Sequence, residues 1–201
     1  MADPLPDASL DQLFRAARSY NGFLDRPVSE DQLRQIWDLM KMGPTSANLF
    51  PLRIIWCVSD AAKLKLSKVV KGNNDAKVLK APVTAILAMD TKFYDHAARL
   101  FPIVDLRSWF VNEKEEVNEA YADTTAFRNS SLQGAYFIMA ARAIGLDTGP
   151  MSGFDHDGVD QVFLAGTSFK SNFLCTLGYG DPASIFERMP RPSFEEFTTI
   201  A

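Results

Sequence analysis

One long helix, expected from Tyr121 to Ile144, limits the possible folds of this chain more than any other sequence feature. Gly145 follows it and suits the first position beyond a helix end, where a left-handed backbone is favoured. Small side chains recur along the helix and let other backbone segments come close to it: Ser130, Ser131, Gly134, Ala135, Ala140, Ala141 and Ala143. The sequence therefore predicts a fold in which other elements pack tightly against this helix.

Shorter elements are expected on both sides of the long helix. Ser29 and Gln32 have the spacing of a capping box. Apolar residues recur on one helical face after this box: Leu33, Ile36, Trp37 and Met40. The other expected elements are helices near 9–17, 60–71 and 155–164 and extended or strand segments at 53–58, 82–89, 146–148 and 173–179.

Two segments show no clear periodicity. Residues 91–112 are rich in aromatic side chains and could form either a lid or an outer helix. Because most aromatic residues belong to the core, Trp109 and Phe110 can also be explained by packing alone. The tail from residue 183 contains prolines and several phenylalanines. This pattern favours a tail that wraps around a partner surface over one that floats free.

Composition limits the class of protein. The 201 residues, of which 47% are hydrophobic and 23% charged, suit one globular domain over residues 1–201, with residues 183–201 as an extension. Its apolar runs fall short of the ~18–20 residues of a membrane span, and its first ten residues do not resemble a signal peptide. A net charge of −4 argues against nucleic-acid binding. Cys57 and Cys175 are isolated in apolar runs, which predicts buried free thiols and a cytoplasmic location.

The segment from Gly43 to Ile54 combines short polar side chains with stiffening prolines. Hydroxyls and an amide from Thr45, Ser46 and Asn48 could meet a planar polar ligand. The same residues could equally form a helix-ending turn with local hydrogen bonds. From these residues alone, both interpretations stand.

Several common catalytic sites are absent from the sequence. It lacks a phosphate-binding glycine motif after a strand and a Gly-x-Ser-x-Gly elbow. His96 and His156 are the only histidines and are not spaced as metal ligands, so we expect no metal site. A chain with so few acid–base groups can still perform redox chemistry when a flavin supplies the reactive atom.

Two segments resemble the nitroreductase family of FMN-dependent oxidoreductases. Residues 44–52 are similar to the family loop Pro-Ser-Ser-x-Asn-x-Gln-Pro-Trp, with Phe50 and Leu52 departing from it. Residues 147–155 resemble the Pro-x-Glu-Gly-Phe-Asp turn, with Ser152 in place of glutamate. These departures, together with residues 126–131 and 169–172, resemble one branch of the family. That branch holds malonic semialdehyde reductases and relatives named NADH dehydrogenases or NAD(P)H nitroreductases.

The resemblance implies an α+β fold with a mainly antiparallel sheet surrounded by helices, in an intertwined homodimer. The long helix would lie at the interface, and the C-terminal extension would cross to the partner. FMN would be the cofactor and NAD(P)H the co-substrate, in a ping-pong reaction that passes a hydride through flavin N5. The implied acceptor is malonic semialdehyde, reduced to 3-hydroxypropionate in pyrimidine degradation. A general nitroaromatic or quinone reductase and a flavin-binding or flavin-modifying protein without turnover stay open, and no side chain is assigned as catalytic.

The resemblance also implies which residues would hold FMN. Ser19 matches a family phosphate ligand, Arg18 is one place from a family arginine, Asn21 replaces a basic residue, and Arg188 matches a C-terminal arginine. Without the resemblance, both arginines read as ordinary surface residues. The other implied cofactor ligands are Pro44, Thr45, Ser46, Asn48, Asn74, Lys77, Asn129, Pro150, Met151, Ser152 and Gly153.

The family pattern divides these ligands between two chains. Ser19, Asn74, Lys77 and Asn129 would come from one chain, and Thr45, Ser46 and Asn48 from the other. Spacing alone also allows Asn74 to be a helix cap after Gly72.

Two further arginines are candidates for binding an anionic acceptor. Arg107 and Arg128 lie in segments shared with the malonic semialdehyde branch. An ion pair with Asp105 or Asp123 is the plainer explanation, since arginines at surfaces often pair with acids.

Overall fold

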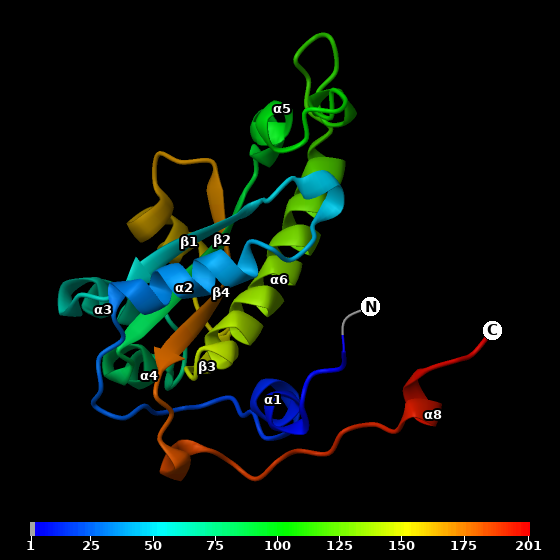
Figure 1. The fold of residues 1–201 in the computed structure, drawn as a ribbon. Coiled ribbons are helices and arrows are strands. Elements are labelled where there is room, and N and C mark those ends of the chain that lie inside the picture. Colours follow the sequence, from blue (N-terminus) through cyan, green and yellow to red (C-terminus); the bar gives the residue numbers. More distant parts are fainter. Residues whose placement is uncertain (1–2) are drawn as a thin grey trace.

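The computed structural model describes residues 3–201 and is built around one antiparallel sheet (Figure 1). The strand order is β1-β2-β4-β3. The strands are β1 (Leu52–Cys57), β2 (Val83–Asp90), β3 (Asp147–Met151) and β4 (Phe169–Gly178). The two central strands, β2 and β4, are the most deeply buried. All four predicted extended segments are therefore present in the sheet.

Helix α6 (Glu119–Ala143) lies across the sheet and begins two residues earlier than predicted. The Asn118 side chain caps it by accepting a hydrogen bond from the Tyr121 N–H at 3.3 Å. Gly145 follows the helix with a φ of 79°, as expected for a residue just past a helix end. A Cβ on Gly134 would lie 2.5 Å from the Phe173 ring, so this small residue makes room for a side chain of β4.

Helix α2 (Glu30–Met40) packs beside α6 on the same side of the sheet. The capping box between Ser29 and Gln32 is present. The core between these two helices and the sheet contains Leu33, Ile36, Met40, Leu87, Phe137 and Leu177. This part of the fold follows directly from the local sequence signals.

Helices α3 (Asp60–Ser67) and α4 (Asn74–Lys80) pack with β1, β2 and β4 through a second core that includes Leu66, Val78, Ile86, Phe154 and Leu174. Two predictions were wrong here. Helix α3 ends four residues earlier than expected, and its cap is Ser59, whose Oγ accepts from the Ala62 N–H at 3.2 Å. Helix α4 lies in a region where no helix was predicted.

Residues 91–118 form an outer layer at one end of α6 (Figure 1). Short helical turns occur here, including α5 (Ala97–Leu100). Phe93, Tyr94 and Phe110 are buried together, with ring centroids 5.0 to 5.8 Å apart. Trp109 is instead exposed. Most aromatic residues of this segment therefore form a small separate core, which packs against Leu49 and Ala122.

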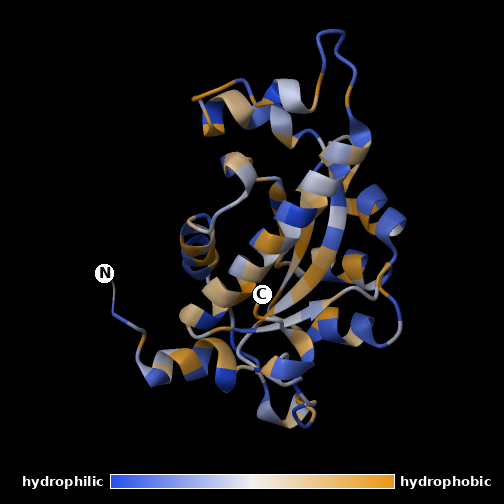
Figure 2. Cartoon of the chain, turned by 90° about the vertical axis from the view of Figure 1, so that its right-hand side faces the viewer, coloured by the Kyte–Doolittle hydropathy of each residue, from blue (hydrophilic) through white to orange (hydrophobic). Residues whose placement is uncertain are grey.

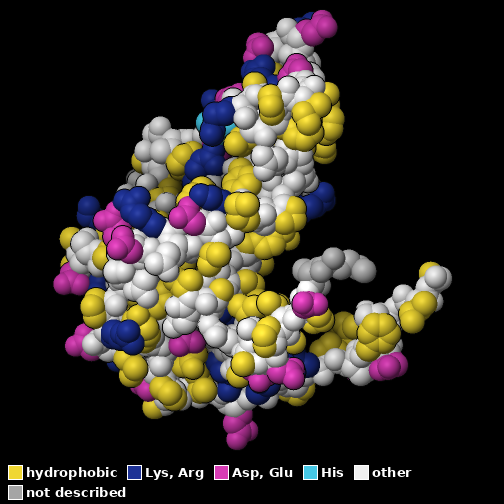
Figure 3. All heavy atoms as spheres, in the orientation of Figure 1, with side chains coloured by type: hydrophobic (Ala, Val, Ile, Leu, Met, Phe, Trp, Pro, Cys, Tyr) yellow, Lys and Arg dark blue, Asp and Glu magenta, His cyan; other side chains and the backbone are white. Residues whose placement is uncertain are grey.

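The two ends of the described chain are less embedded. The first elements are α1 (Asp7–Leu10) and a π-helical turn, Asp11–Arg15. Helix α7 (His156–Val159) and a second π-helical turn, Asp160–Leu164, occupy the third predicted helical region. The tail runs away from the body and holds only α8 (Phe194–Phe197) as a helix after the turn at Pro182–Ser184 (Figure 1). Its exposed apolar side chains include Phe186, Met189, Phe194 and Phe197. Figure 3 shows hydrophobic side chains along this tail.

Two expectations about composition can be compared with the fold. Within residues 3–201, no helix has the length and apolar character needed to cross a membrane. Cys57 and Cys175 are free and buried, and burial raises the pKa of their thiols to about 11 and about 12. The thiols are therefore protonated and unreactive near neutral pH.

Candidate functional site

The loop from Pro44 to Phe50 connects α2 to β1 and has an unusual backbone. Ala47, Asn48 and Phe50 have φ values of 46°, 56° and 50°, in the left-handed region. Asparagine tolerates this region, but alanine and phenylalanine lose roughly 1–2 kcal/mol each there. Such strain is found where surrounding contacts impose it, often at functional sites.

Hydrogen bonds from two neighbouring segments hold this loop. The Ser46 N–H donates to Asn129 Oδ1 at 2.8 Å, and Tyr136 Oη donates to the Pro44 carbonyl at 3.0 Å. Asn48 Nδ2 donates to the Leu100 carbonyl at 2.8 Å. The Ser46 and Asn48 side chains are still exposed. Thr45 Oγ1 is buried without a hydrogen-bond partner in the described part of the chain.

Asn129 is buried beside the backbone of Ser46. Only 2% of this residue is exposed, and its Nδ2 donates to the Thr125 carbonyl at 2.9 Å while its Oδ1 accepts from Ser46. Asn129 and Ser46 were expected to reach a cofactor from different chains, yet they bond to each other within one chain. The structure thus makes Asn129 a support for the loop.

A second group of predicted residues meets on the other side of the fold. Arg18, Ser19 and Arg188 line one cavity of about 380 Å³. The segment after β4 returns to residues 17–22, so that Arg188 Nη2 donates to the Ala17 carbonyl at 3.0 Å and Arg18 donates to the Phe186 carbonyl. Asn21 lies just outside this cavity, where its Nδ2 donates to the Ser184 carbonyl at 3.1 Å.

The same cavity contains two arginines that the sequence interpretation missed, Arg142 and Arg191. Arg142 Nη1 donates to the Leu13 carbonyl at 2.9 Å, but its Nε is buried with no partner among residues 3–201. Burial lowers the pKa of Arg142, and the nearby Asp147 opposes that effect. The sequence signal that could have indicated Arg142 is its position as a lone basic residue among alanines in the last turn of α6. A partly buried guanidinium with a free N–H is suited to an anion.

A third group gathers at the end of β3. Asn74 Nδ2 and the Lys71 N–H both donate to the Gly153 carbonyl, at 2.9 and 2.8 Å. A Cβ on Gly153 would lie 2.7 Å from Asn74 Nδ2, so only glycine fits here without a shift. Asn74 is the first residue of α4 rather than its cap, which is Asn73. The structure thus brings Asn74 to Gly153, while Pro150 and Met151 belong to β3. Half-buried Lys77 lies one turn further along α4.

The two candidate acceptor-binding arginines differ in their surroundings. Arg107 Nη2 lies 2.6 Å from Glu115 Oε2, and its Nε lies 3.3 Å from Asp95 Oδ1. These hydrogen bonds raise the pKa of Arg107 and lower that of Glu115. Arg107 therefore forms ion pairs, as the plainer explanation expected, but with Glu115 and Asp95 rather than with Asp105 or Asp123. Arg128 is exposed on α6 and has no acidic partner in the described chain.

A further cavity, of about 610 Å³, lies between α2, β1 and α5. Basic residues line it without any acidic residue in its wall, and Figure 3 shows their side chains gathered on this side. They are Lys41, Arg53, His96 and Arg99. Of the predicted site residues, only Asn48 reaches this cavity.

Comparisons with known proteins show the family of this chain. Residues 15–180 match the family model described as "Nitroreductase family". A "Putative NADH dehydrogenase/NAD(P)H nitroreductase" of Burkholderia lata is 53% identical over 196 residues, covering 98% of both chains. A protein of the same description from Stenotrophomonas maltophilia strain K279a is 52% identical over 201 residues, covering all of both.

Solved structures also resemble this fold. A "putative nitroreductase" from Bacillus subtilis has a TM-score of 0.85 at 24% identity, covering 98% of this chain and 100% of that one. A "putative nitroreductase in complex with FMN" from Exiguobacterium sibiricum has a TM-score of 0.82 at 18% identity, covering 100% of both. At these identities the likeness establishes the fold, and it confirms the predicted α+β class.

Proposed function

The chain belongs to the nitroreductase family, and from this premise we propose that it is an FMN-dependent NAD(P)H oxidoreductase. The observation that carries the proposal is the gathering of Arg18, Ser19, Arg142 and Arg188 around one cavity, with the buried Nε of Arg142 left without a partner in residues 3–201. With Arg191, four guanidinium groups and the Ser19 hydroxyl line this cavity, which also has Glu187 in its wall, and their donors outnumber its one carboxylate and suit a phosphate.

The other parts of the chain fit the rest of this cofactor. The Gly153 turn lacks a side chain that would block the approach of a flat ring, and Asn74 fixes the carbonyl of that turn. Lys77 would place a positive charge near the same end of the ring, where it would favour the reduced, anionic flavin. When bound, FMN would supply hydride transfer between NAD(P)H and an acceptor in a ping-pong sequence. The role of the protein residues would be to bind and orient both substrates.

We further propose that two copies of the chain form a homodimer with two FMN sites. Within residues 3–201, the Pro44–Phe50 loop borders one cavity and the arginines proposed to bind the phosphate border another. The loop of a partner chain would therefore complete each site. Exposed apolar residues support an interface on α6, which faces the viewer in Figure 2, and they include Phe127 and Leu132. Residues 183–201 would be an extension of a single domain and would cross to the partner. The two free, buried cysteines support a cytoplasmic location.

For the acceptor, we propose malonic semialdehyde, reduced to 3-hydroxypropionate. Its support is the resemblance of residues 126–131 and 169–172 to that branch, together with the exposed and unpaired Arg128. A general nitroaromatic or quinone reductase is the second candidate. The engagement of Arg107 by Glu115 and Asp95 favours this second candidate, because the cation expected over an anionic acceptor is already neutralised.

Two measurements test these proposals. Purified protein should be a yellow dimer by absorbance and light scattering, and NADH or NADPH should bleach its flavin rapidly without oxygen. A protein that binds FMN but is not bleached would instead be a flavin-binding protein, and a colourless monomer that ignores FMN would refute the proposal. Turnover with malonic semialdehyde, a nitroaromatic and a quinone then ranks the acceptors. Parallel double-reciprocal plots are expected for the ping-pong sequence, and intersecting lines would exclude it.

A further inference from the structure

The strained Pro44–Phe50 loop is fixed at its C-terminal end by a residue that was not among the predicted site residues. Arg53 is the second residue of β1, and its Nη1 donates to the carbonyls of Phe50 and Leu52, both at 2.9 Å. Phe50 is one of the residues with a positive φ. The guanidinium therefore holds the carbonyl of a residue whose backbone conformation would not persist without support.

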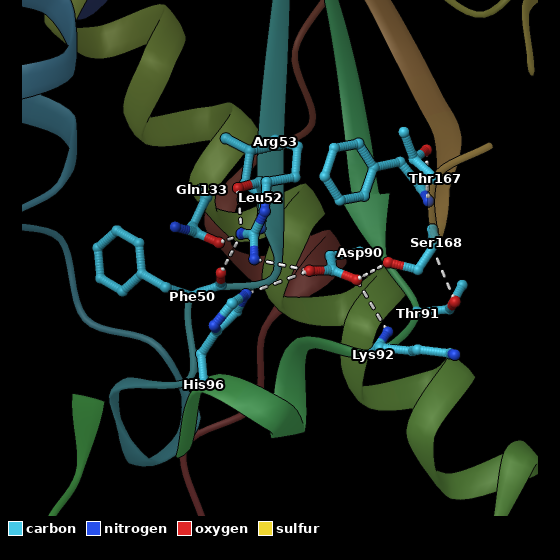
Figure 4. Close-up of polar contacts among 11 residues, drawn as sticks. Phe50, Leu52, Arg53, Asp90, Thr91, Lys92, His96, Gln133, Thr167 and Ser168 are labelled. Atoms are coloured by element: carbon cyan, nitrogen blue, oxygen red, sulfur yellow. Dashed lines mark hydrogen bonds and ion pairs between the residues drawn. The ribbon is translucent and has the colours of Figure 1, made fainter. Parts of the chain in front are cut away.

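A buried carboxylate sets the orientation of that guanidinium (Figure 4). Arg53 Nη2 donates to Asp90 Oδ2 at 2.7 Å, and only 4% of the Asp90 side chain is exposed. Because Arg53 uses both terminal nitrogens in fixed directions, its planar fork connects the loop rigidly to the end of β2. Burial lowers the pKa of Arg53, and the Asp90 carboxylate acts against that effect.

The Asp90 carboxylate is itself held from the opposite side. Its Oδ1 accepts from Ser168 Oγ at 2.6 Å and from the Lys92 N–H at 2.9 Å. His96 Nε2 lies 3.7 Å from Oδ2. A carboxylate with partners on both oxygens cannot rotate freely, so the position of the Arg53 fork is determined by the sheet and by the start of the outer layer.

We propose that Arg53 and Asp90 are positioning residues that keep the Pro44–Phe50 loop in its strained conformation and so set the place of Ser46 and Asn48. This inference rests on the proposed function, because the geometry of the loop matters for turnover only if the loop takes part in the flavin site. Arg53 and Asp90 act through the loop backbone and are not assigned any contact with FMN or the acceptor.

A purely structural role for this ion pair is the competing explanation. Removing one partner of a buried pair destabilises a protein because the remaining charge is left uncompensated, whereas removing both charges often does not. A positioning role makes a different prediction, since the Phe50 carbonyl loses its donor whenever Arg53 is removed, both in Arg53→Met and in the double variant. In a double variant, the stability of the protein should therefore recover while the loop stays less ordered.

The experiment compares Arg53→Met, Asp90→Asn and the double variant with the native chain. Methionine keeps an apolar stem beside Phe169, over whose ring the Arg53 guanidinium lies at 5.6 Å, but it has no donor for Phe50. Asparagine can still accept from Ser168 and Lys92. Arg34→Met is the matched control, because it removes an arginine from an exposed pair with Glu30 on α2.

Three readouts are taken on each protein with and without FMN: thermal unfolding, amide hydrogen exchange of residues 44–52, and the anaerobic rate of FMN reduction by NAD(P)H. Arg53→Met should lower the melting temperature, and the double variant should recover most of that loss. Exchange of the loop amides should be about 10-fold faster in both. Reduction should be slower by roughly 10- to 100-fold in both, the scale of a small misplacement of binding groups.

The outcomes separate the possible explanations. A double variant that recovers loop protection and reduction rate together with stability would show that the pair is only structural, and would overturn the inference. Faster loop exchange with an unchanged reduction rate in FMN-loaded protein would also overturn it. If the native chain neither holds FMN nor is reduced, the proposed function fails. In that case the exchange data still show whether Arg53 orders the loop.

Discussion

The loop from Pro44 to Phe50 and the basic cavity around Arg142 differ in how their polar groups are partnered. In the loop, Asn129, Tyr136 and Arg53 from the same chain satisfy the backbone groups and hold three residues at positive φ. In the cavity, arginines converge and the Arg142 Nε is left without a partner in residues 3–201. The loop is therefore ordered by the protein itself, whereas the cavity keeps a donor without a partner in the described residues.

This difference has energetic consequences. Residues that order the loop should affect folding stability even without a ligand, because they replace water as partners of buried backbone groups. Residues of the basic cavity should mainly affect ligand affinity, and removing them should cost the ligand-free protein little. Each prediction below changes one side of this contrast.

The largest effect is expected from Arg142→Met. A hydrogen bond to a charged group contributes about 1.5–3 kcal/mol, so the dissociation constant for FMN should rise by roughly 10- to 100-fold. Without FMN, the melting temperature should stay the same or rise, because an incompletely paired buried charge is removed. Fluorescence titration of apoprotein with FMN and thermal unfolding measure the two effects.

Arg15→Met is the control for this prediction. Arg15 is also a basic residue near the N-terminal segment, but it is exposed and pairs with Asp7 and Asp11. Its loss should leave FMN affinity nearly unchanged. Equal affinities in the native chain and Arg142→Met would place the phosphate elsewhere and remove the main support for the proposed cofactor site.

Asn129→Ala tests the loop side of the contrast. It removes the acceptor for the Ser46 N–H and leaves that group without its partner, so the free energy of unfolding should fall by about 1–3 kcal/mol. Urea denaturation measures this change, with Asn112→Ala, which alters an exposed asparagine, as the control. A variant of native stability that has lost FMN would instead restore Asn129 as a direct cofactor ligand.

The sequence predicted best where the signals were local. The capping box of α2, the glycine after α6 and the apolar strands depend on residues within one or two turns of each other. Helix α4 was missed because it is short and Asn73 makes no side-chain cap bond. The start of β4 was missed because Lys170, Ser171 and Asn172 interrupt its apolar pattern, although Asn172 packs inward and donates to Ser130 and Ser131.

The site residues were likewise predicted poorly where their roles depend on distant parts of the chain. Arg18 and Arg188 could be paired only through the family resemblance, because 170 positions separate them in the chain. Arg142 could not be found in this way, since its role depends on the end of α6 arriving at the same cavity. The partners of Arg107 were also missed, because Glu115 reaches it across a turn in which Glu115 itself has a φ of 60°. Roles that arise from tertiary contacts leave little trace in a single sequence.

Gly153→Ala should moderately lower both folding stability and FMN affinity. The new Cβ would lie 2.7 Å from Asn74 Nδ2, and relieving this overlap should cost about 1–2 kcal/mol of stability. The displaced turn should also weaken FMN binding by about 10-fold, since a shift of this size disturbs ligand packing. Adding Asn74→Ala should recover the stability but not the affinity. A Gly153→Ala variant with native affinity would show that the turn does not approach the flavin.

The smallest effect is expected from Arg107→Ala, because its guanidinium is exposed and already paired with Glu115 and Asp95. Turnover of malonic semialdehyde and of a neutral quinone should change by less than about threefold, and equally, as is typical for a surface pair. Arg107 lowers the pKa of Glu115, so the small stability from this pair is present at neutral pH and is lost as the pH falls through that lowered pKa. The difference in melting temperature between native and variant protein should therefore shrink in acid. A selective loss of malonic semialdehyde turnover would instead show that Arg107 leaves its acidic partners to bind the acceptor carboxylate.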